Sequence, residues 1–209
     1  MGIHITGVGS YIPSHKEKNQ DFLAHTFLDD SGNPFGADNG EIIEKFKAIT
    51  GIEERRYAKP HQTASDLAFL AAEKAIEDTS LDPETLDYII VAHNFGDIQH
   101  GCIQTDMLPS LATRVKHNLQ IKNPNCVAYD LIFGCPGWVE GVIQAKAFIK
   151  SGMAKRCLVI GADTLSRIAD QNDRDAMIFA DGAGATIIEE TKESGGLLSY
   201  SSQTYSTEE

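Results

Sequence analysis

Two unbroken apolar runs, at 88–92 and 157–162, constrain this chain most, because neither offers a polar face to water. Each run has the length of one strand and is bounded by charged or polar residues. Strands that read this way are buried on both faces, as in parallel sheets covered by helices. Helical patterns lie between the apolar runs, so the order of elements predicts an α/β protein with helices on both faces of a largely parallel sheet.

The spacing of apolar residues predicts the other elements. The clearest helix is expected over 63–78, where Leu67, Ala71 and Ala75 fall on one face. Residues 14–40 are polar and contain a turn cluster, so we expect an exposed excursion there. Strands are expected at 3–10, 87–94, 126–131, 157–162 and 181–188, with a further short one at 197–201, and the remaining helices at 41–49, 108–119 and 136–150.

Length, charge and cysteine content limit the classes of function. The 209 residues fit one compact domain, and 18 Lys and Arg against 30 Asp and Glu give a net charge of −12. This acidic net charge argues against a protein that binds nucleic acid. No apolar stretch approaches the roughly 18 residues of a membrane span, and the four cysteines form no secreted disulfide framework. We therefore expect a cytoplasmic protein with free thiols that binds neither nucleic acid nor membrane.

Cys135 lies where a predicted strand changes into a predicted helix, between Gly134 and Pro136. Proline is favoured at the first position of a helix, so Cys135 is expected at the cap position of a tight turn. Gly134 and Gly137 leave room for a strained backbone and for a substrate. The partial positive charge at a helix start favours the thiolate, the nucleophilic form of cysteine. The position therefore predicts a cysteine nucleophile.

The other cysteines and the histidines give weaker signals. Cys126 and Cys157 lie within apolar strand runs and are expected to be buried, whereas Cys102 lies in a loop. All seven histidines precede Cys135. Only His93, at a predicted strand end, is a weak candidate for the base that a cysteine nucleophile usually needs.

Metal and nucleotide sites are not indicated. No Cys-x-x-Cys pair is present, so we expect no metal site. The glycine pairs at 7–9 and 182–184 do not lead into helices, which argues against a phosphate-binding loop. Gly182 and Gly184 are instead expected to allow close packing of the backbone.

A series of short motifs follows the chain in a fixed order. They are Gly7-x-Gly-Ser-Tyr-x-Pro13, Asn19-x-Asp21, Thr50-Gly51-Ile52-x-Glu54-Arg55, the turn around Cys135, Lys150-Ser151-Gly152, Asp173-Arg174 and Asp181-Gly182-Ala183-Gly184-Ala185. Together they resemble the β-ketoacyl-acyl carrier protein synthase III family of condensing enzymes, in the thiolase superfamily, over nearly the whole chain. The resemblance implies the N-terminal half of a thiolase-like fold, with a mixed, largely parallel five-stranded sheet.

The resemblance also implies roles for four residues. Cys135 would accept the acyl group of an acyl-CoA, and Arg174 would meet the nucleotide end of coenzyme A. Leu108 would be the residue that one subunit of a homodimer inserts into its partner's acyl pocket, and Phe179 would lie on the wall near the site. The activity implied is decarboxylative Claisen condensation with malonyl-acyl carrier protein in fatty acid or related lipid biosynthesis, with coenzyme A and carrier-protein thioesters as substrates and no cofactor.

Departures from the family leave alternatives open. The Trp and Arg that hold adenine in the family fall around Lys45 and at Ile49 here, and residues 27–40 look like a polar insertion of unknown use. The histidine and asparagine of the decarboxylation step belong to a C-terminal half, so we expect residues 1–209 to be the N-terminal domain alone. The alternatives are an acyltransferase or head-to-head condensing relative in secondary metabolism, and a non-catalytic dimerisation or scaffold fragment.

Overall fold

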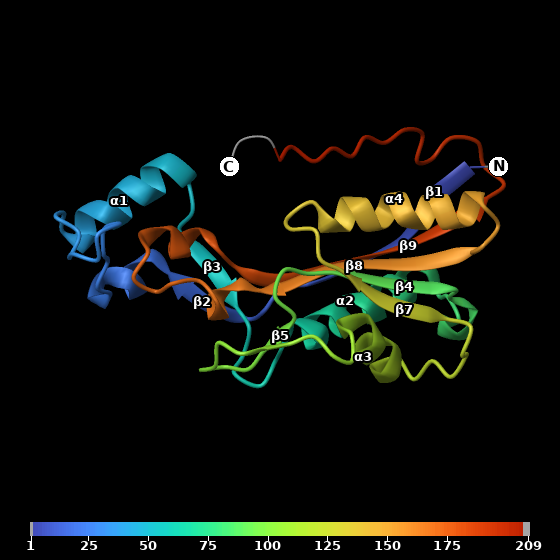
Figure 1. Ribbon diagram of the computed structural model, residues 1–209, viewed down its shortest axis with the longest axis horizontal. Helices are drawn as coiled ribbons and strands as arrows, with labels where there is room; N and C mark the ends of the chain where they lie inside the picture. The colour runs from blue at the N-terminus through green and yellow to red at the C-terminus, as the bar shows by residue number, and fades with distance from the viewer. Residues whose placement is uncertain (1, 207–209) are drawn as a thin grey trace.

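A central sheet of five strands organises the computed structural model, which describes residues 2–206 (Figure 1). β4 pairs in parallel with both β7 and β8, whereas β9 runs antiparallel to β8 and to β1. β9 is thus the one strand that runs against the other four, and the predicted mixed, largely parallel sheet is confirmed. The strand order is β1 (Gly2–Tyr11), β9 (Asp181–Thr191), β8 (Arg156–Thr164), β4 (Tyr88–Ala92) and β7 (Val127–Leu131).

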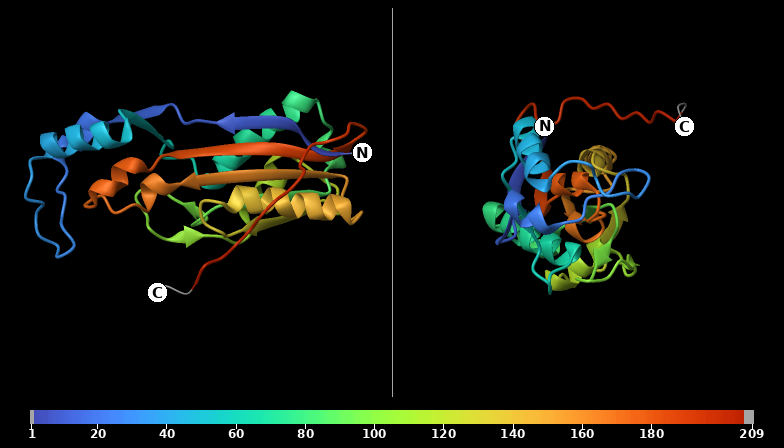
Figure 2. Two further views of the ribbon diagram at one scale, coloured as in Figure 1. Left: turned by 90° about the horizontal axis from the view of Figure 1, so that it is seen from above. Right: turned by 90° about the vertical axis from the view of Figure 1, so that its left-hand side faces the viewer.

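Helices cover both faces of this sheet, as Figures 1 and 2 show. α2 (Ala64–Thr79) and α3 (Leu111–Asn118) lie on one face, and α4 (Gly137–Lys150) lies on the other. The side chains of β8 alternate between the two cores: Leu158 packs against α2 and α3, whereas Val159 packs against α4. This burial on both sides explains the unbroken apolar run at 157–162.

The start of α2 follows from its sequence. Thr63 and Asp66 form a capping box, in which the Thr63 backbone N–H donates to Asp66 Oδ2 at 2.8 Å. Behind this cap, Leu67, Ala71 and Ala75 are fully buried against the sheet. The predicted helix at 63–78 is confirmed.

An outer lobe lies beyond the carboxyl ends of β4 and β8, at one end of the elongated molecule (Figure 1). It consists of the β2 (His15–Lys18) and β3 (Glu54–Tyr57) pair, the 3-10 helix η1 (Asn19–Ala24) and α1 (Asn39–Thr50). Phe22 and Phe27 are buried there with Ile42 and Met177. The predicted exposed excursion over residues 14–40 is therefore wrong at these two phenylalanines, because they form a small core of their own.

Two other predictions need correction. The helix expected over 108–119 begins at Leu111, because the Ser110 hydroxyl caps it by accepting from the Thr113 N–H at 3.1 Å. No strand forms at 197–201, where one backbone bond from Leu197 to Ile3 is followed by irregular chain. The cause is a turn at Gly195 and Gly196, whose φ angles of 99° and 85° are left-handed.

The remaining elements are short and lie mostly in connections. Among residues 2–206, no helix is both long and apolar enough to cross a bilayer. These elements are η2 (Pro83–Thr85), β5 (Asp97–Ile98), β6 (Thr105–Asp106), η3 (Leu165–Arg167) and η4 (Arg174–Ile178).

Candidate functional site

Cys135 lies on the turn between β7 and α4, and its side chain is exposed. Gly134 adopts a left-handed φ of 73°, and its carbonyl accepts from the Gly137 N–H at 3.0 Å, which closes the turn. Pro136 rather than Cys135 occupies the cap position of α4, so the predicted capping position is wrong by one residue. The thiol nevertheless lies two residues before Gly137, the first residue of a 14-residue helix, and neither Gly134 nor Gly137 has a side chain to cover it.

A hollow of about 280 Å³ opens beside Cys135. The carboxyl ends of β4 and β8 and the start of β9 form its walls, because these three neighbouring strands bring their backbones to one edge of the sheet. A Cβ built on Gly184 would meet no atom within 4 Å. The prediction that Gly184 allows close packing is therefore wrong, since this glycine faces the open hollow instead. The residues lining the hollow are Ala92, His93, Asn94, Gly134, Cys135, Trp138, Gly161, Ala162, Asp163, Gly182, Ala183 and Gly184.

His93 lines this hollow, yet both of its ring nitrogens are occupied. The Gly96 N–H donates to Nδ1 at 3.0 Å, so Nδ1 is an acceptor and the ring proton lies on Nε2. Nε2 then donates to Asp130 Oδ2 at 3.0 Å. This arrangement leaves no lone pair to take a proton from Cys135, so His93 is a structural residue in this geometry.

A second polar pair joins the ends of β4 and β8 in the same hollow. The Asn94 backbone N–H donates to Asp163 Oδ1 at 3.0 Å, and its side-chain Nδ2 donates to Oδ2 at 2.7 Å. Burial raises the pKa of Asp163, and the two Asn94 bonds oppose that shift only in part. The hollow that Cys135 lines thus also contains an aspartate whose pKa lies above its ordinary value.

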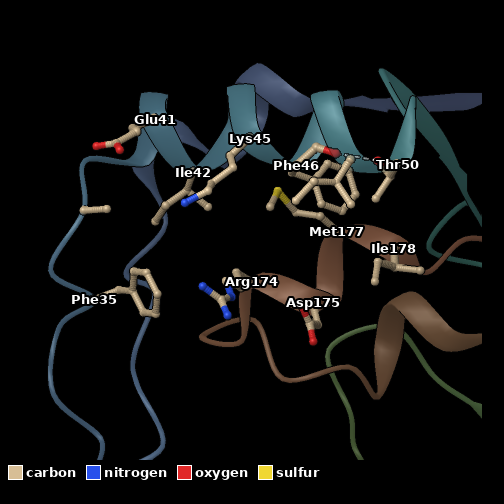
Figure 3. A pocket seen from close by; sticks show the side chains of 12 residues that line it. Phe35, Glu41, Ile42, Lys45, Phe46, Thr50, Arg174, Asp175, Met177 and Ile178 are labelled. Carbon is tan, nitrogen blue, oxygen red and sulfur yellow. Dashed lines mark hydrogen bonds between the residues drawn. The ribbon is translucent and has the colours of Figure 1, made fainter.

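A larger hollow of about 440 Å³ lies in the outer lobe, between α1 and η4 (Figure 3). Its walls are mostly apolar, and Lys45, Glu41, Arg174 and Asp175 carry charge at its border. The two positions at which the sequence departs from the resembled family, Lys45 and Ile49, both line it. The lining residues are Phe35, Ala37, Glu41, Ile42, Lys45, Phe46, Ile49, Thr50, Arg174, Asp175, Met177 and Ile178.

The structure brings the predicted site residues to different places. Cys135 lines the inner hollow and Arg174 the outer one, whereas Leu108 and Phe179 line neither. Leu108 is 85% exposed, on the loop before α3, and Phe179 is 40% exposed, so neither is an ordinary core residue. Their roles therefore stay predictions.

Sequence reasoning missed several polar groups near the thiol. Asn94, Asp130 and Asp163 each end or follow an apolar strand run, which is the signal that could have placed them at one sheet edge. Among the residues that the structure describes, no group of three or more His, Cys, Asp or Glu side chains is arranged to hold a metal ion.

Sequence comparison supports the motif-based resemblance. Residues 129–206 match the family described as "3-Oxoacyl-[acyl-carrier-protein (ACP)] synthase III". The chain is 38% identical over 201 residues to a "Beta-ketoacyl-[acyl-carrier-protein] synthase III" of Staphylococcus haemolyticus, which covers 96% of this chain and 57% of that protein. A protein of the same name from Neisseria gonorrhoeae is 38% identical over 192 residues, covering 91% of this chain and 53% of that protein. The chain spans about half the length of the curated relatives it matches.

Comparison with solved structures agrees. A 3-oxoacyl-[acyl-carrier-protein] synthase III from Aquifex aeolicus superposes with a TM-score of 0.74 at 33% identity, over 92% of this chain and 55% of that one. The priming β-ketosynthase of the R1128 polyketide pathway superposes with a TM-score of 0.73 at 26% identity, over 91% of this chain and 51% of that one.

Proposed function

Because the chain belongs to the 3-oxoacyl-acyl-carrier-protein synthase III family, with the thiolase-like fold that its sequence implies, we propose that Cys135 is the acyl-accepting nucleophile of a condensing enzyme. One observation carries the proposal: the Cys135 thiol is exposed between a strand end and a helix start, beside a hollow that opens to solvent. Of the other three cysteines, Cys157 is buried in β8, Cys126 is buried just before β7, and the exposed Cys102 does not line this hollow.

The proposed first step is transfer of an acyl group from coenzyme A to Cys135. The thiolate sulfur attacks the thioester carbonyl carbon, a new carbon–sulfur bond forms, and the bond to the coenzyme A sulfur breaks. Coenzyme A leaves as a thiolate and takes up the proton that Cys135 has lost. The Cys135 backbone N–H is a proposed donor to the oxyanion, and loss of one such donor typically costs about 2.7–4 kcal/mol of transition-state stabilisation.

The outer hollow is the proposed site for the nucleotide end of coenzyme A. It carries Arg174, and arginine recognises phosphate by paired N–H donors. Ile178 lines the outer hollow and Gly182 the inner one, so at most about 14 Å of extended chain separates these two residues. A coenzyme A thioester has a flexible arm between its nucleotide and its thioester, and this arm would bridge the two hollows.

Condensation is proposed for the whole protein rather than for these 209 residues. In the family, malonyl-acyl carrier protein is decarboxylated by a histidine and an asparagine of the C-terminal half. Acyl carrier protein is therefore a proposed partner, together with a second copy of the subunit. Leu108, exposed on its loop, is the proposed contact with that copy's acyl pocket, and Phe179 is a proposed wall residue.

Intact mass spectrometry tests the acylation step. The chain is incubated with acetyl-, butyryl- and octanoyl-CoA, beside Cys135→Ala and, as a matched control, Cys102→Ala. We expect one acyl adduct on the native chain and on Cys102→Ala, and none on Cys135→Ala. An adduct that persists in Cys135→Ala would refute the assignment. No adduct on the native chain would favour the scaffold alternative, and adduct formation without malonyl decarboxylation by the whole protein would favour an acyltransferase.

A further inference from the structure

We propose that Phe35 is a positioning residue, which holds the Arg174 guanidinium in the orientation that binds the phosphates of a nucleotide in the outer hollow. The Arg174 Cζ lies 4.5 Å from the centroid of the Phe35 ring. Figure 3 shows the two side chains next to each other, on the side of the hollow opposite α1. The inference rests on the proposed function, and it gives the 27–40 segment a use.

Phe35 is held in place by the segment that carries it. Its backbone N–H donates to the carbonyl of the buried Phe27 at 2.8 Å, and Leu28 pairs with Pro34 across the hairpin. The hairpin is fixed in turn to the chain just before η4. The Leu28 N–H donates to the Asn172 carbonyl at 2.9 Å, and Asn172 Nδ2 donates to the Thr26 carbonyl at 2.8 Å. The hairpin that carries Phe35 and the segment that carries Arg174 are thus joined by hydrogen bonds.

The N–H donors of the Arg174 guanidinium are available to bind a ligand. Among residues 2–206 its guanidinium forms no ion pair and no hydrogen bond, and it contacts the face of the Phe35 ring. Arg55, in the same lobe, differs from Arg174 in its hydrogen bonds. Its guanidinium donates to the Met177 carbonyl at 2.9 Å and to Asn19 Oδ1, which makes it a structural arginine.

A cation over an aromatic face is attracted electrostatically while its in-plane N–H donors stay available. The ring therefore restricts the rotamers of Arg174 without consuming the groups that a phosphate needs. An arginine that is already ordered loses less entropy on binding. Removing the ring should weaken binding of a phosphate-bearing ligand and leave binding of its uncharged counterpart unchanged.

Calorimetric titration of the 209-residue chain tests this. The probes are coenzyme A and adenosine 3′,5′-bisphosphate, with adenosine as the uncharged comparison. Phe35→Leu keeps an apolar side chain but loses the ring, and we expect it to weaken bisphosphate binding about twofold to fivefold. Phe35→Tyr keeps the ring and is expected to match the native chain. Arg174→Ala is expected to weaken binding about tenfold or more.

The double variant separates positioning from a contact of its own. If Phe35 acts through Arg174, Phe35→Leu has no further effect in the Arg174→Ala background. Phe35→Leu that binds as the native chain does, or that weakens adenosine equally, would overturn the inference. If Arg174→Ala itself leaves coenzyme A binding unchanged, the proposed nucleotide site fails instead. Thermal unfolding of each variant, with Ser31→Ala at the hairpin tip as control, reports whether the hairpin stays folded.

Discussion

The His93 imidazole donates to the Asp130 carboxylate at 3.0 Å, and this bond joins the ends of β4 and β7 beside the hollow that Cys135 lines. The same carboxylate accepts from the backbone N–H groups of Leu111 and Ala112 at 2.7 and 2.8 Å. Asp130 therefore also caps α3, the helix that follows the Leu108 loop. This largely buried pair therefore links two strands and one helix near the candidate site.

Loss of the His93 imidazole should lower stability rather than remove a base. In His93→Ala, the Asp130 carboxylate loses the donor at Nε2, and the buried Gly96 N–H loses its acceptor at Nδ1. We therefore expect a loss of about 1–3 kcal/mol in the free energy of unfolding. Urea unfolding of the native chain and of His93→Ala measures this difference in free energy. His93→Gln, which keeps a donor at a similar reach, serves as the control and should lose less. Unchanged stability together with loss of Cys135 acylation would instead identify His93 as a catalytic base.

The Asp97–Arg114 pair should be worth more than the neighbouring Asp106–Arg114 pair. Asp97 is 4% exposed and accepts from the Ser65 N–H and Oγ as well as from Arg114, at 2.6 to 2.7 Å. Asp97→Asn replaces one of these acceptor oxygens by an NH2 group and leaves a buried donor without its partner, so it should cost about 1–3 kcal/mol. Asp106 is exposed, and Asp106→Asn should cause no measurable change.

Urea unfolding of the two variants decides this prediction. Arg114 also donates to the Pro109 carbonyl at 3.0 Å, so the same clamp holds the loop that carries Leu108. Equal losses in Asp97→Asn and Asp106→Asn would show that burial does not set the strength of these pairs.

The sheet and its covering helices could be predicted because each signal was local. The run at 157–162, the capping box at Thr63 and the glycine stop at Gly51, whose φ is 71°, all act within one turn or one strand. The prediction of an exposed excursion over 14–40 failed because burial there depends on distant partners. Phe22 and Phe27 are buried in a cluster that includes Met177, about 150 residues later in the chain. The sequence of 14–40 alone is polar enough to suggest an exposed loop.

The candidate site was predictable in part for the same reason. Cys135 stands on a local strand–turn–helix pattern, which a reader of the sequence can see. The His93–Asp130 and Asn94–Asp163 pairs join residues 37 and 69 positions apart, so no spacing rule reveals them. The aromatic contact of Arg174 with Phe35 depends on how a hairpin folds back, which the polar composition of 27–40 hides.

Asp163 should make the protein less stable as the pH rises. Burial raises its pKa in the folded state, so the folded chain holds this proton more tightly than the unfolded chain does. Stability from this group is therefore present at low pH and is lost as the pH rises from about 4 through the raised pKa. Asp163→Asn lacks this titration but also disturbs the Asn94 bonds, so the informative quantity is the change with pH.

Urea unfolding at several pH values between 4 and 7 measures that change. The free energy of unfolding of the native chain, relative to Asp163→Asn, should fall as the pH increases. A relative gain in native stability over the same range would mean that the Asn94 bonds outweigh burial and that the ionised carboxylate is favoured.

Alkylation should separate the four thiols into two pairs. Cys102 and Cys135 are exposed, whereas Cys126 and Cys157 are buried. Burial raises the pKa of Cys126 and raises that of Cys157 to about 12. At pH 8 only roughly one Cys157 side chain in ten thousand would then be the reactive thiolate, and the reagent cannot reach it in the folded chain.

Iodoacetamide should add two groups to the native chain and four in urea, as read by intact mass. Cys135→Ala should accept one group when folded, and Cys126→Ala, the control at a buried position, should still accept two. Rapid modification of Cys157 in the folded chain would show that α4 separates from the sheet often enough to expose this thiol. The exposure of Cys135 would then not be enough to explain why an acyl group is transferred to Cys135 rather than to Cys157.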